Sequence, residues 1–387
     1  MAMTVLVGFA ESLAAIESVW SLRDAGFRVV AFTREGRRPA VAAAKGVRVV
    51  EVPSPERDLT ASLAALRALV AEEKAVAAMP FDDAALLLTD RLADIVKVAG
   101  PTGANAALAL DKSEQLELAA KAGFAVPDTA IIRPGEKAEL PGAGPWMVKC
   151  AEAEVERDGK LTRPSGGIAR TSSEAHEIAA EIGAPALVQR LVDGVGEGIF
   201  GYAAGGQVFA LSAHRRVRMM NPRGSGSSAC RSIDVDPQLA AAVAHFCELA
   251  GWNGIFMIEL LVDDAGNAWF MELNGRTWGS MALARARGLA YPEWALRGTL
   301  DPEFRPPATP PAPHLLSRHL GREIVHLLAV MRGARGADAG RWPSRGATLA
   351  AMLRPAGRTR WYNARRGESA VLARDTWQTV AGQLRRR

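Results

Sequence analysis

Hydrophobic and polar residues alternate over the first 106 residues in a way that predicts a parallel α/β layer. Apolar runs at 4–9, 28–33, 47–52 and 75–80 have the length and composition of buried strands. Between them, 11–26 and 59–73 have the spacing of amphipathic helices. Strands that alternate with helices favour parallel pairing, so we expect an N-terminal α/β domain over residues 1–106.

From residue 107 to 300 the pattern changes to α+β. A helix is predicted to begin at Asp111-Lys112-Ser113 and to end near Gly123. The remaining strands should form an antiparallel-rich unit with a lid over about 145–205, and Gly194–Gly198 should be a turn. These strands are predicted at 146–149, 186–192, 199–203, 208–213 and, as a pair, within 255–274.

The last segment, 301–387, is predicted to be a connector followed by helices. The proline-rich run 305–313 cannot form a helix or a central strand, so we expect an extended connector. Residues 314–330 then have apolar positions at helical spacing. The expected architecture is therefore an N-terminal α/β domain, an α+β domain with a lid, and a mainly helical C-terminal segment.

The strand pair within 255–274 carries the clearest chemical signal. If Asp263 pairs with Ala268 and the register continues undisturbed, Glu259 lies opposite Glu272, with Cβ atoms about 5 Å apart. Alternation then puts Asn274 and Arg276 on the same face as Glu272. Two carboxylates and an amide oxygen are hard ligands that suit Mg²⁺, and an arginine beside them suits a phosphate.

A solvated hairpin with acidic side chains facing water is the alternative interpretation of this pair. The neighbouring apolar residues argue against it, because they predict that at least one face of the pair is covered; they are Phe256, Ile258, Leu260, Phe270, Met271 and Leu273. A second acidic pair, Asp82-Asp83, follows a predicted strand. It could line a cleft at the carboxyl edge of the sheet, but such a pair is more typical of a helix N-cap.

Composition and charge exclude several classes. No apolar run reaches the roughly 18–20 residues that span a bilayer, and we expect a cytoplasmic protein. Gly8, near the end of the first predicted strand, lacks the companions of a G-x-G-x-x-G fingerprint, which argues against a classical dinucleotide site, and the absence of a G-x-S-x-G elbow argues against a serine hydrolase. Three cysteines without metal-ligand spacing suggest buried, reduced thiols.

The positive charge is concentrated in the C-terminal segment. Residues 301–387 contain sixteen arginines, no lysine and six acids, which gives a net charge of +10. Since the whole chain has a net charge of +5, residues 1–300 have a net charge of −5. The segment could be a helical cap with solvated arginines. It could instead bind an acidic carrier protein or peptide, or attach to an anionic membrane through 314–331. We do not expect a nucleic-acid partner.

In this order, the motifs resemble those of the ATP-grasp superfamily, in particular its carbamoyl-phosphate-synthase-like branch with the carboxylate–amine ligases. The resemblance covers about residues 1–300 and implies ATP and two Mg²⁺ ions as cofactors, with Mn²⁺ as an alternative metal. Glu259, Glu272 and Asn274 match the metal ligands, and Arg276 matches a residue that contacts the terminal phosphate.

The same resemblance implies further nucleotide-binding residues. Lys112 and Lys149 match the two nucleotide lysines, and Ser165-Gly166-Gly167 matches the lid loop. The segment Gln189-Arg190-Leu191 matches the hinge that binds adenine through one side chain and backbone groups, and Glu197 matches the ribose-binding acid.

The segment 214–228 resembles the substrate and phosphate loop of the family. There, Arg216 and Arg218 are implied to neutralise an acyl phosphate, and the Ser227 region to stabilise the oxyanion. The resemblance thus implies a carboxylate–amine ligase that releases ADP and phosphate and joins small molecules, amino acids foremost. Activation of bicarbonate or a carbamate, and a nucleotide-binding regulatory protein without turnover, are the alternatives.

Overall fold

Five parallel strands form the N-terminal layer, as the sequence predicts. The computed structural model describes residues 2–222, 224, 226–308, 315–334, 342–354 and 358–385. The sheet order is β3-β2-β1-β4-β5, and the order reverses between β1 and β4. Its strands are β1 (Thr4–Gly8), β2 (Arg28–Arg34), β3 (Arg48–Val52), β4 (Ala77–Pro80) and β5 (Lys97–Val98).

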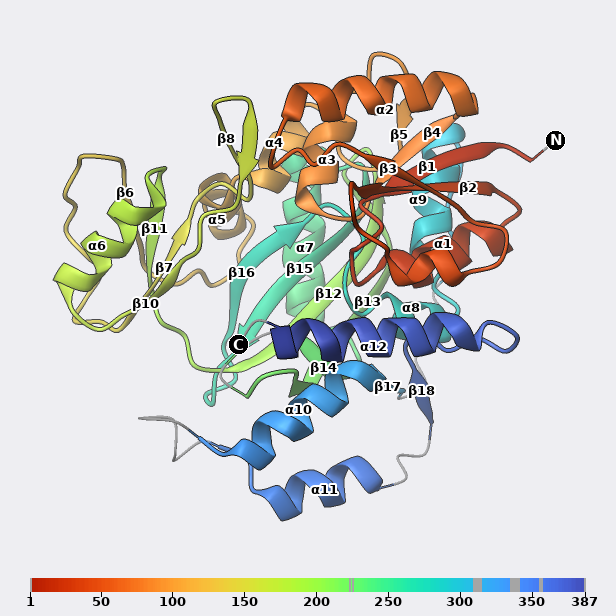
Figure 1. The fold of residues 1–387 in the computed structure, drawn as a ribbon. Coiled ribbons are helices and arrows are strands. Elements are labelled where there is room, and N and C mark those ends of the chain that lie inside the picture. Colours follow the sequence, from red (N-terminus) through yellow and green to blue (C-terminus); the bar gives the residue numbers. More distant parts are fainter. Residues whose placement is uncertain are drawn as a thin grey trace.

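Helices cover both faces of this sheet (Figure 1). The first helix begins at Ala15, four residues later than predicted. The helices of this part are α1 (Ala15–Asp24), the 3₁₀ turn η1 (Ala40–Ala43), α2 (Leu59–Glu73), α3 (Asp83–Asp90) and α4 (Ala104–Leu110), joined by α8 (Met281–Ala286) and α9 (Tyr291–Leu300). Asp82 caps α3, since its carboxylate accepts the N–H of Ala85 at 2.8 Å, and the N-cap interpretation of Asp82 is confirmed.

A smaller antiparallel sheet, in the order β10-β7-β11-β6, forms a separate lobe with one helix on it (Figure 1). It consists of β6 (Thr129–Ile132), β7 (Trp146–Cys150), β10 (Gly167–Ala169) and β11 (Ala186–Arg190), with α6 (Ser172–Ile182). A hairpin between β7 and β10, made of β8 (Val155–Arg157) and β9 (Lys160–Thr162), leaves the lobe and contacts the N-terminal layer. Its Leu161 is fully buried in the core beside α2, and the N–H of Leu59 donates to the Gly159 carbonyl at 2.8 Å.

The largest sheet has seven strands in the order β16-β15-β12-β13-β14-β17-β18. Helices α5 (Lys112–Lys121) and α7 (Pro237–Ala250) cover one face, and the other face packs against the N-terminal layer through Phe200, Met257 and Trp278. The strands are β12 (Val195–Ala204), β13 (Gln207–Met219), β14 (Ser227–Ile233), β15 (Gly254–Val262), β16 (Ala268–Asn274), β17 (Leu316–Arg318) and β18 (Thr359–Trp361).

Two predictions of local structure in this sheet are wrong. Residues 195–198 belong to β12 rather than to a turn, and residues 214–219 extend β13 rather than starting a loop. In both places glycine and arginine suggested irregular structure. However, β12 pairs with both β13 and β15, and these neighbouring strands complete its backbone hydrogen bonds. Cross-strand pairing therefore outweighs the weak local preference of the glycine and arginine residues.

The C-terminal segment is mainly helical, as expected, but it also adds two strands to the large sheet. Leu316–Arg318, predicted as the start of a helix, forms β17. The helices are α10 (Leu320–Arg332), α11 (Arg345–Leu353) and α12 (Ser369–Arg385). The connector residues 309–313 lie outside the described residues. Among the described helices, none is both long and apolar enough to cross a membrane.

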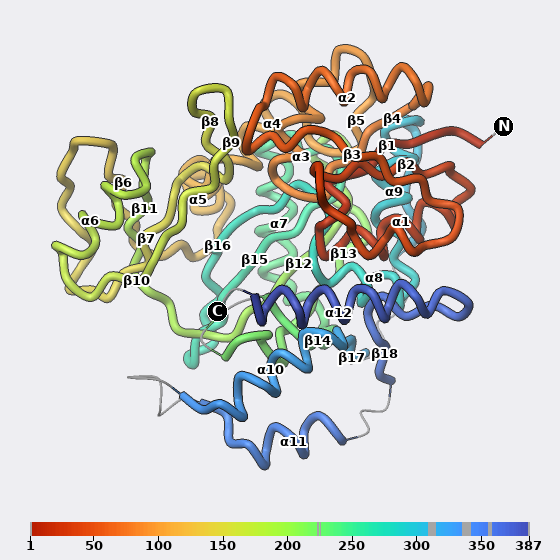
Figure 2. The backbone as a smooth tube through the Cα atoms, viewed as in Figure 1, coloured from red at the N-terminus to blue at the C-terminus, as the bar shows by residue number. Residues whose placement is uncertain are grey.

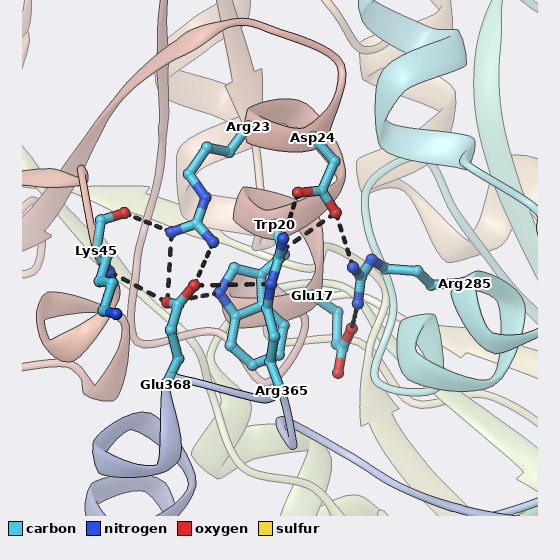
Figure 3. A network of polar contacts seen from close by, with 8 residues as sticks. All are labelled: Glu17, Trp20, Arg23, Asp24, Lys45, Arg285, Arg365 and Glu368. Atoms are coloured by element: carbon cyan, nitrogen blue, oxygen red, sulfur yellow. Dashed lines mark hydrogen bonds and ion pairs between the residues drawn. The ribbon is translucent and has the colours of Figure 1, made fainter.

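A polar network, buried at Glu368 and partly exposed at Asp24, holds the C-terminal segment against α1. Glu368 accepts hydrogen bonds from Trp20 Nε1 at 3.1 Å and from the Lys45 backbone N–H at 3.1 Å, and it pairs with Arg23 (Figure 3). Asp24 is bound by both Arg365 and Arg285, at 2.7 and 2.8 Å. Helix α12 packs against the 3₁₀ turn η1 and against α10, and in the tube view it passes below the N-terminal layer (Figure 2).

These contacts favour the helical-cap interpretation of the basic segment. Arg318 and Arg365 have carboxylate partners inside the molecule, and Val371 of α12 is fully buried in the same core as Trp20. The segment therefore joins the N-terminal layer to the large sheet. A contact with an acidic carrier protein finds no support in this arrangement.

The network predicts that Glu368→Gln destabilises the protein by about 1–3 kcal/mol, because the amide cannot serve all the donors around this nearly buried carboxylate. Urea unfolding would measure the change. Glu35→Gln, on an exposed side chain, is the control and should leave the free energy of unfolding within about 0.5 kcal/mol. Equal stability of Glu368→Gln and the unaltered protein would contradict the network's role.

Candidate active site

A one-residue β-bulge in β16 brings Glu259 and Glu272 together. The ladder pairs Val262 with Ala268 and Leu260 with Phe270, skips Met271, and then pairs Glu259 with Glu272. The predicted pair is therefore confirmed, but the undisturbed register from Asp263 is wrong. Without the bulge, Glu272 would lie opposite Ile258 and point into the apolar core on the other face.

Arg216 places a positive charge at this carboxylate pair. It lies on β13 and reaches Glu259 on β15 at 2.6 Å by crossing the intervening strand β12. The crossing requires Gly196, because a Cβ there would lie 2.6 Å from Arg216 Cδ. Burial raises the pKa of Glu259; Arg216 offsets part of this, whereas the Glu272 charge adds to it.

The two predicted nucleotide lysines lie close to these carboxylates. Lys149 of β7 is buried enough that desolvation lowers its pKa, while the charges of Glu272 and Glu259 act to raise it and that of Lys112 acts to lower it. The N–H of Lys112 donates to the Ala151 carbonyl at 2.8 Å, which fixes the start of α5 to the end of β7. Lys149 therefore lies near the carboxylate pair, and Lys112 lies near Lys149.

The predicted glycine loop lies directly against β7. A Cβ at Gly166 would fall 2.1 Å from the Val148 carbonyl oxygen and 3.0 Å from Lys149 Cα, so only glycine allows the approach. Ser165 precedes it in the loop, and Gly167 begins β10, paired with Val148. The loop therefore passes beside Lys149.

Arg276 binds the N-terminal layer through Asp83. Its guanidinium donates to the two carboxylate oxygens of Asp83 at 2.7 and 3.1 Å, and Arg163, which precedes the glycine loop, reaches the same carboxylate at 3.2 Å. Although burial opposes it, the charge of these arginines lowers the pKa of Asp83 to about 2. Glu272 also acts on Arg276, so Arg276 lies between the metal pair and Asp83.

The hinge segment has a buried acceptor that no described residue satisfies. The Gln189 side chain is 1 % exposed; its Nε2 donates to Thr129 Oγ1 at 3.1 Å, and its Oε1 has no hydrogen-bond partner in the part of the chain that the structure describes. An unsatisfied acceptor fits the amino group of adenine. The backbone N–H groups of Arg190 and Leu191 already donate to the carbonyls of Asp128 and Pro145, and the Arg190 side chain lies over Trp269.

Three other predicted residues do not join this group. Glu197 alternates onto the opposite face of β12 and pairs with Arg215 at 2.5 Å. A bulge between Arg216 and Arg218 turns Arg218 away, and it forms a bidentate pair with Glu323 of α10 at 2.7 and 2.9 Å. Ser227 begins β14, and its hydroxyl contacts Cys230 Sγ at 2.9 Å.

The donor set fits a magnesium ion held partly by a nucleotide. Within the described residues, no group of three or more His, Cys, Asp and Glu side chains is arranged to hold a metal. Glu259, Glu272 and the neighbouring Asn274 amide, whose Nδ2 donates to Glu272 at 3.2 Å, supply only hard oxygen donors. Mg²⁺ commonly takes one or two carboxylates and completes its shell with phosphate oxygens and water.

Similar folds are found among solved structures, at low identity. No protein-family model and no curated protein matches the chain. An L-amino acid ligase from Bacillus licheniformis has a TM-score of 0.60 and 16 % identity, and the match covers 78 % of this chain and 74 % of the ligase. A biotin carboxylase from Campylobacter jejuni in a β,γ-ATP complex has a TM-score of 0.61 and 14 % identity, with 80 % and 73 % covered.

The third similar structure covers the most of both chains. An ADP complex of N5-carboxyaminoimidazole ribonucleotide synthetase has a TM-score of 0.61 and 14 % identity, over 87 % of this chain and 89 % of that one. The chain has the ATP-grasp fold. In this chain the small sheet carries the glycine loop, and the large sheet carries the carboxylate pair.

Two side chains that the sequence does not mark lie near Asp83. They are Arg163 and Glu154, which lie on either side of the β8–β9 hairpin. Burial raises the pKa of Glu154 to about 7; Arg163 offsets part of the shift and Asp83 adds to it. No sequence motif marks them, because their environment depends on docking of the hairpin against the N-terminal layer.

The raised pKa of Glu154 predicts a pH-dependent effect on stability. The neutral acid is favoured in the folded state, so its contribution is complete below about pH 4.5 and is lost as the pH rises through about 7. Glu154→Gln should therefore gain stability relative to the unaltered protein between pH 5 and pH 8, as measured by urea unfolding. A stability difference that does not change over this range would contradict the assignment.

Proposed function

We propose that this protein is an ATP-dependent carboxylate–amine ligase that forms an amide or peptide bond and releases ADP and phosphate. The observation that carries the proposal is the Glu259–Glu272 pair, with Asn274, Lys149 and Arg216 around it. Such a concentration of paired acids and bases is what a magnesium nucleotide requires. Small molecules, amino acids foremost, are the proposed substrates, and one similar structure is an L-amino acid ligase.

ATP would supply the phosphoryl group that converts the substrate carboxylate into an acyl phosphate, with magnesium neutralising the phosphates. Glu259, Glu272 and Asn274 would hold the metal, either as one ion or as two. Lys149 and Lys112 would neutralise the phosphates, and Gln189 Oε1 would accept from the adenine amino group. The glycine loop over Lys149 would exclude water from the phosphates.

The remaining residues act on the substrates by charge and position. Arg216 would neutralise the developing anion when an amine attacks the acyl carbon. Asp83 would hold Arg276 toward the terminal phosphate from the side of the N-terminal layer. No covalent protein intermediate is needed, because positioning and electrostatic stabilisation are sufficient for phosphoryl and acyl transfer of this type. Glu197, Arg218 and Ser227 have no direct role in this scheme.

Incubation with ATP, Mg²⁺ and pooled amino acids and carboxylic acids tests the proposal. We expect ADP and phosphate whose formation depends on an acid–amine pair, together with a new condensed mass. Glu272→Gln should lower the rate by about 100-fold or more, as expected when an electrostatic contact to the transition state is removed. Glu248→Gln, on the exposed side of α7, is the matched control and should not change it.

Other outcomes distinguish the alternatives. ADP formation that depends on bicarbonate would favour activation of bicarbonate in place of an organic acid. Release of AMP and pyrophosphate would contradict an acyl-phosphate mechanism. Magnesium-dependent ATP binding without turnover in any pool would contradict a small-molecule ligase and favour a regulatory protein.

A further inference from the structure

Arg322 of the C-terminal helix α10 reaches the loop that joins β13 to β14. Its Nη1 donates to the Ser227 carbonyl at 3.1 Å. The same nitrogen lies 2.5 Å from the position that a Cβ at Gly226 would occupy, so a side chain at 226 would displace the guanidinium. Helix α10 packs against β14, and Figure 1 shows it beside that strand.

The Arg322 guanidinium has no carboxylate partner among the described residues. Its neighbour Glu323 is fully paired, because Arg218, Arg318 and Ser228 all bind its carboxylate. Asp375 is the acid whose charge acts on Arg322; its carboxylate accepts from Asn363 Nδ2 at 3.0 Å and lies 3.2 Å from the His319 ring. Arg322 is half-buried, and burial lowers its pKa, but a guanidinium stays charged at neutral pH. Partial removal of such a charge from water without a direct carboxylate contact is costly.

A second guanidinium lies close to the first. Arg216, which pairs with Glu259, is the cross-strand partner of Cys230 on β14, and the charges of Arg216 and Arg322 both act on the Cys230 thiol. The Ser227 hydroxyl contacts the same thiol at 2.9 Å, and the Ser227 carbonyl accepts from Arg322. Only Arg216 of these two arginines has a direct carboxylate partner among the described residues, so the pair has an excess of positive charge and of N–H donors, which is the arrangement that binds an oxyanion.

We propose that Arg322 and Arg216 together bind the anionic group of the acid substrate, so that the C-terminal segment completes the active site. The proposal rests on the ligase function for the identity of the ligand. Arg216 connects this anion site to the carboxylate pair through its contact with Glu259. Arg322 supplies the second guanidinium, from the far side of the β13–β14 connection. The excess charge suits a carboxylate before phosphoryl transfer and the phosphate oxygens after it.

Titration of the intact protein, saturated with Mg·ADP, with inorganic phosphate tests the site by calorimetry. Arg322→Gln should weaken phosphate binding about 10- to 100-fold, the loss expected for a charge-assisted pair of hydrogen bonds. The affinity for Mg·ADP should not change. Arg332→Gln, an exposed arginine on the same helix, is the matched control with the same loss of charge and should bind phosphate normally.

Arg322→Lys separates a role in binding from a role in folding. It keeps the charge and should retain most of the phosphate affinity, whereas a purely structural arginine would give a lower Tm in Arg322→Gln with unchanged phosphate binding. That result, equal loss in Arg332→Gln, or no phosphate binding by the unaltered protein would overturn the proposal. Loss of phosphate binding in Arg322→Gln without ligation of any acid–amine pair would support the anion site while refuting the ligase function.

With active protein, the same variants identify the ligand. Arg322→Gln should raise the KM for the acid substrate about 10-fold or more and leave the KM for ATP unchanged. A rise in the KM for ATP alone would assign Arg322 to the nucleotide and overturn its assignment to the acid substrate.

Discussion

Electrostatic repulsion between Glu259 and Glu272 is the constraint on which the site depends. The bulge at Met271 places both carboxylates on one face of the large sheet, where two like charges in a partly buried position destabilise each other. The surrounding cations offset this repulsion: Arg216 by direct contact and Lys149 through its charge. In such a site a metal ion can replace some of the cations at the carboxylates. The phosphates can then bind to the metal ion and to the side-chain cations.

The cationic side chains around the carboxylate pair lie on different elements of the fold. Lys149 lies on β7 and Lys112 lies at the start of α5. The Arg216 side chain extends from β13 over Gly196 of β12. The N-terminal layer holds Arg276 by Asp83, which follows β4 at the point where the sheet order reverses. The C-terminal segment ties these layers together through Glu368 and joins the sheet through β17.

Much of this architecture is predictable from the sequence, because the period of apolar residues directly reflects burial. The parallel layer, the strand pair within 255–274 and the opposition of its two glutamates follow from alternation. The exact register does not, since two errors compensate: the turn pairs Val262 rather than Asp263 with Ala268, and one extra residue at Met271 restores the pairing. A bulge leaves no mark in a pattern of apolar residues.

The partners of long side chains are the least predictable part. Arg216 and Arg218 are two residues apart and look equivalent in sequence, but a bulge sends the first to Glu259 and the second to Glu323. Arg322 lies in a segment whose basic composition suggested solvated arginines. Its position depends on β17 joining the sheet, a contact between residues nearly 90 apart in the chain, for example Ala229 and Arg318.

The decisive measurement is a crystal structure of the protein with Mg²⁺ and a non-hydrolysable ATP analogue. We predict metal density bound by Glu259 and Glu272, phosphates beside Lys149 under the glycine loop, and adenine against Gln189. A nucleotide bound at the carboxyl edge of the parallel sheet, or a metal that contacts neither glutamate, would contradict this prediction.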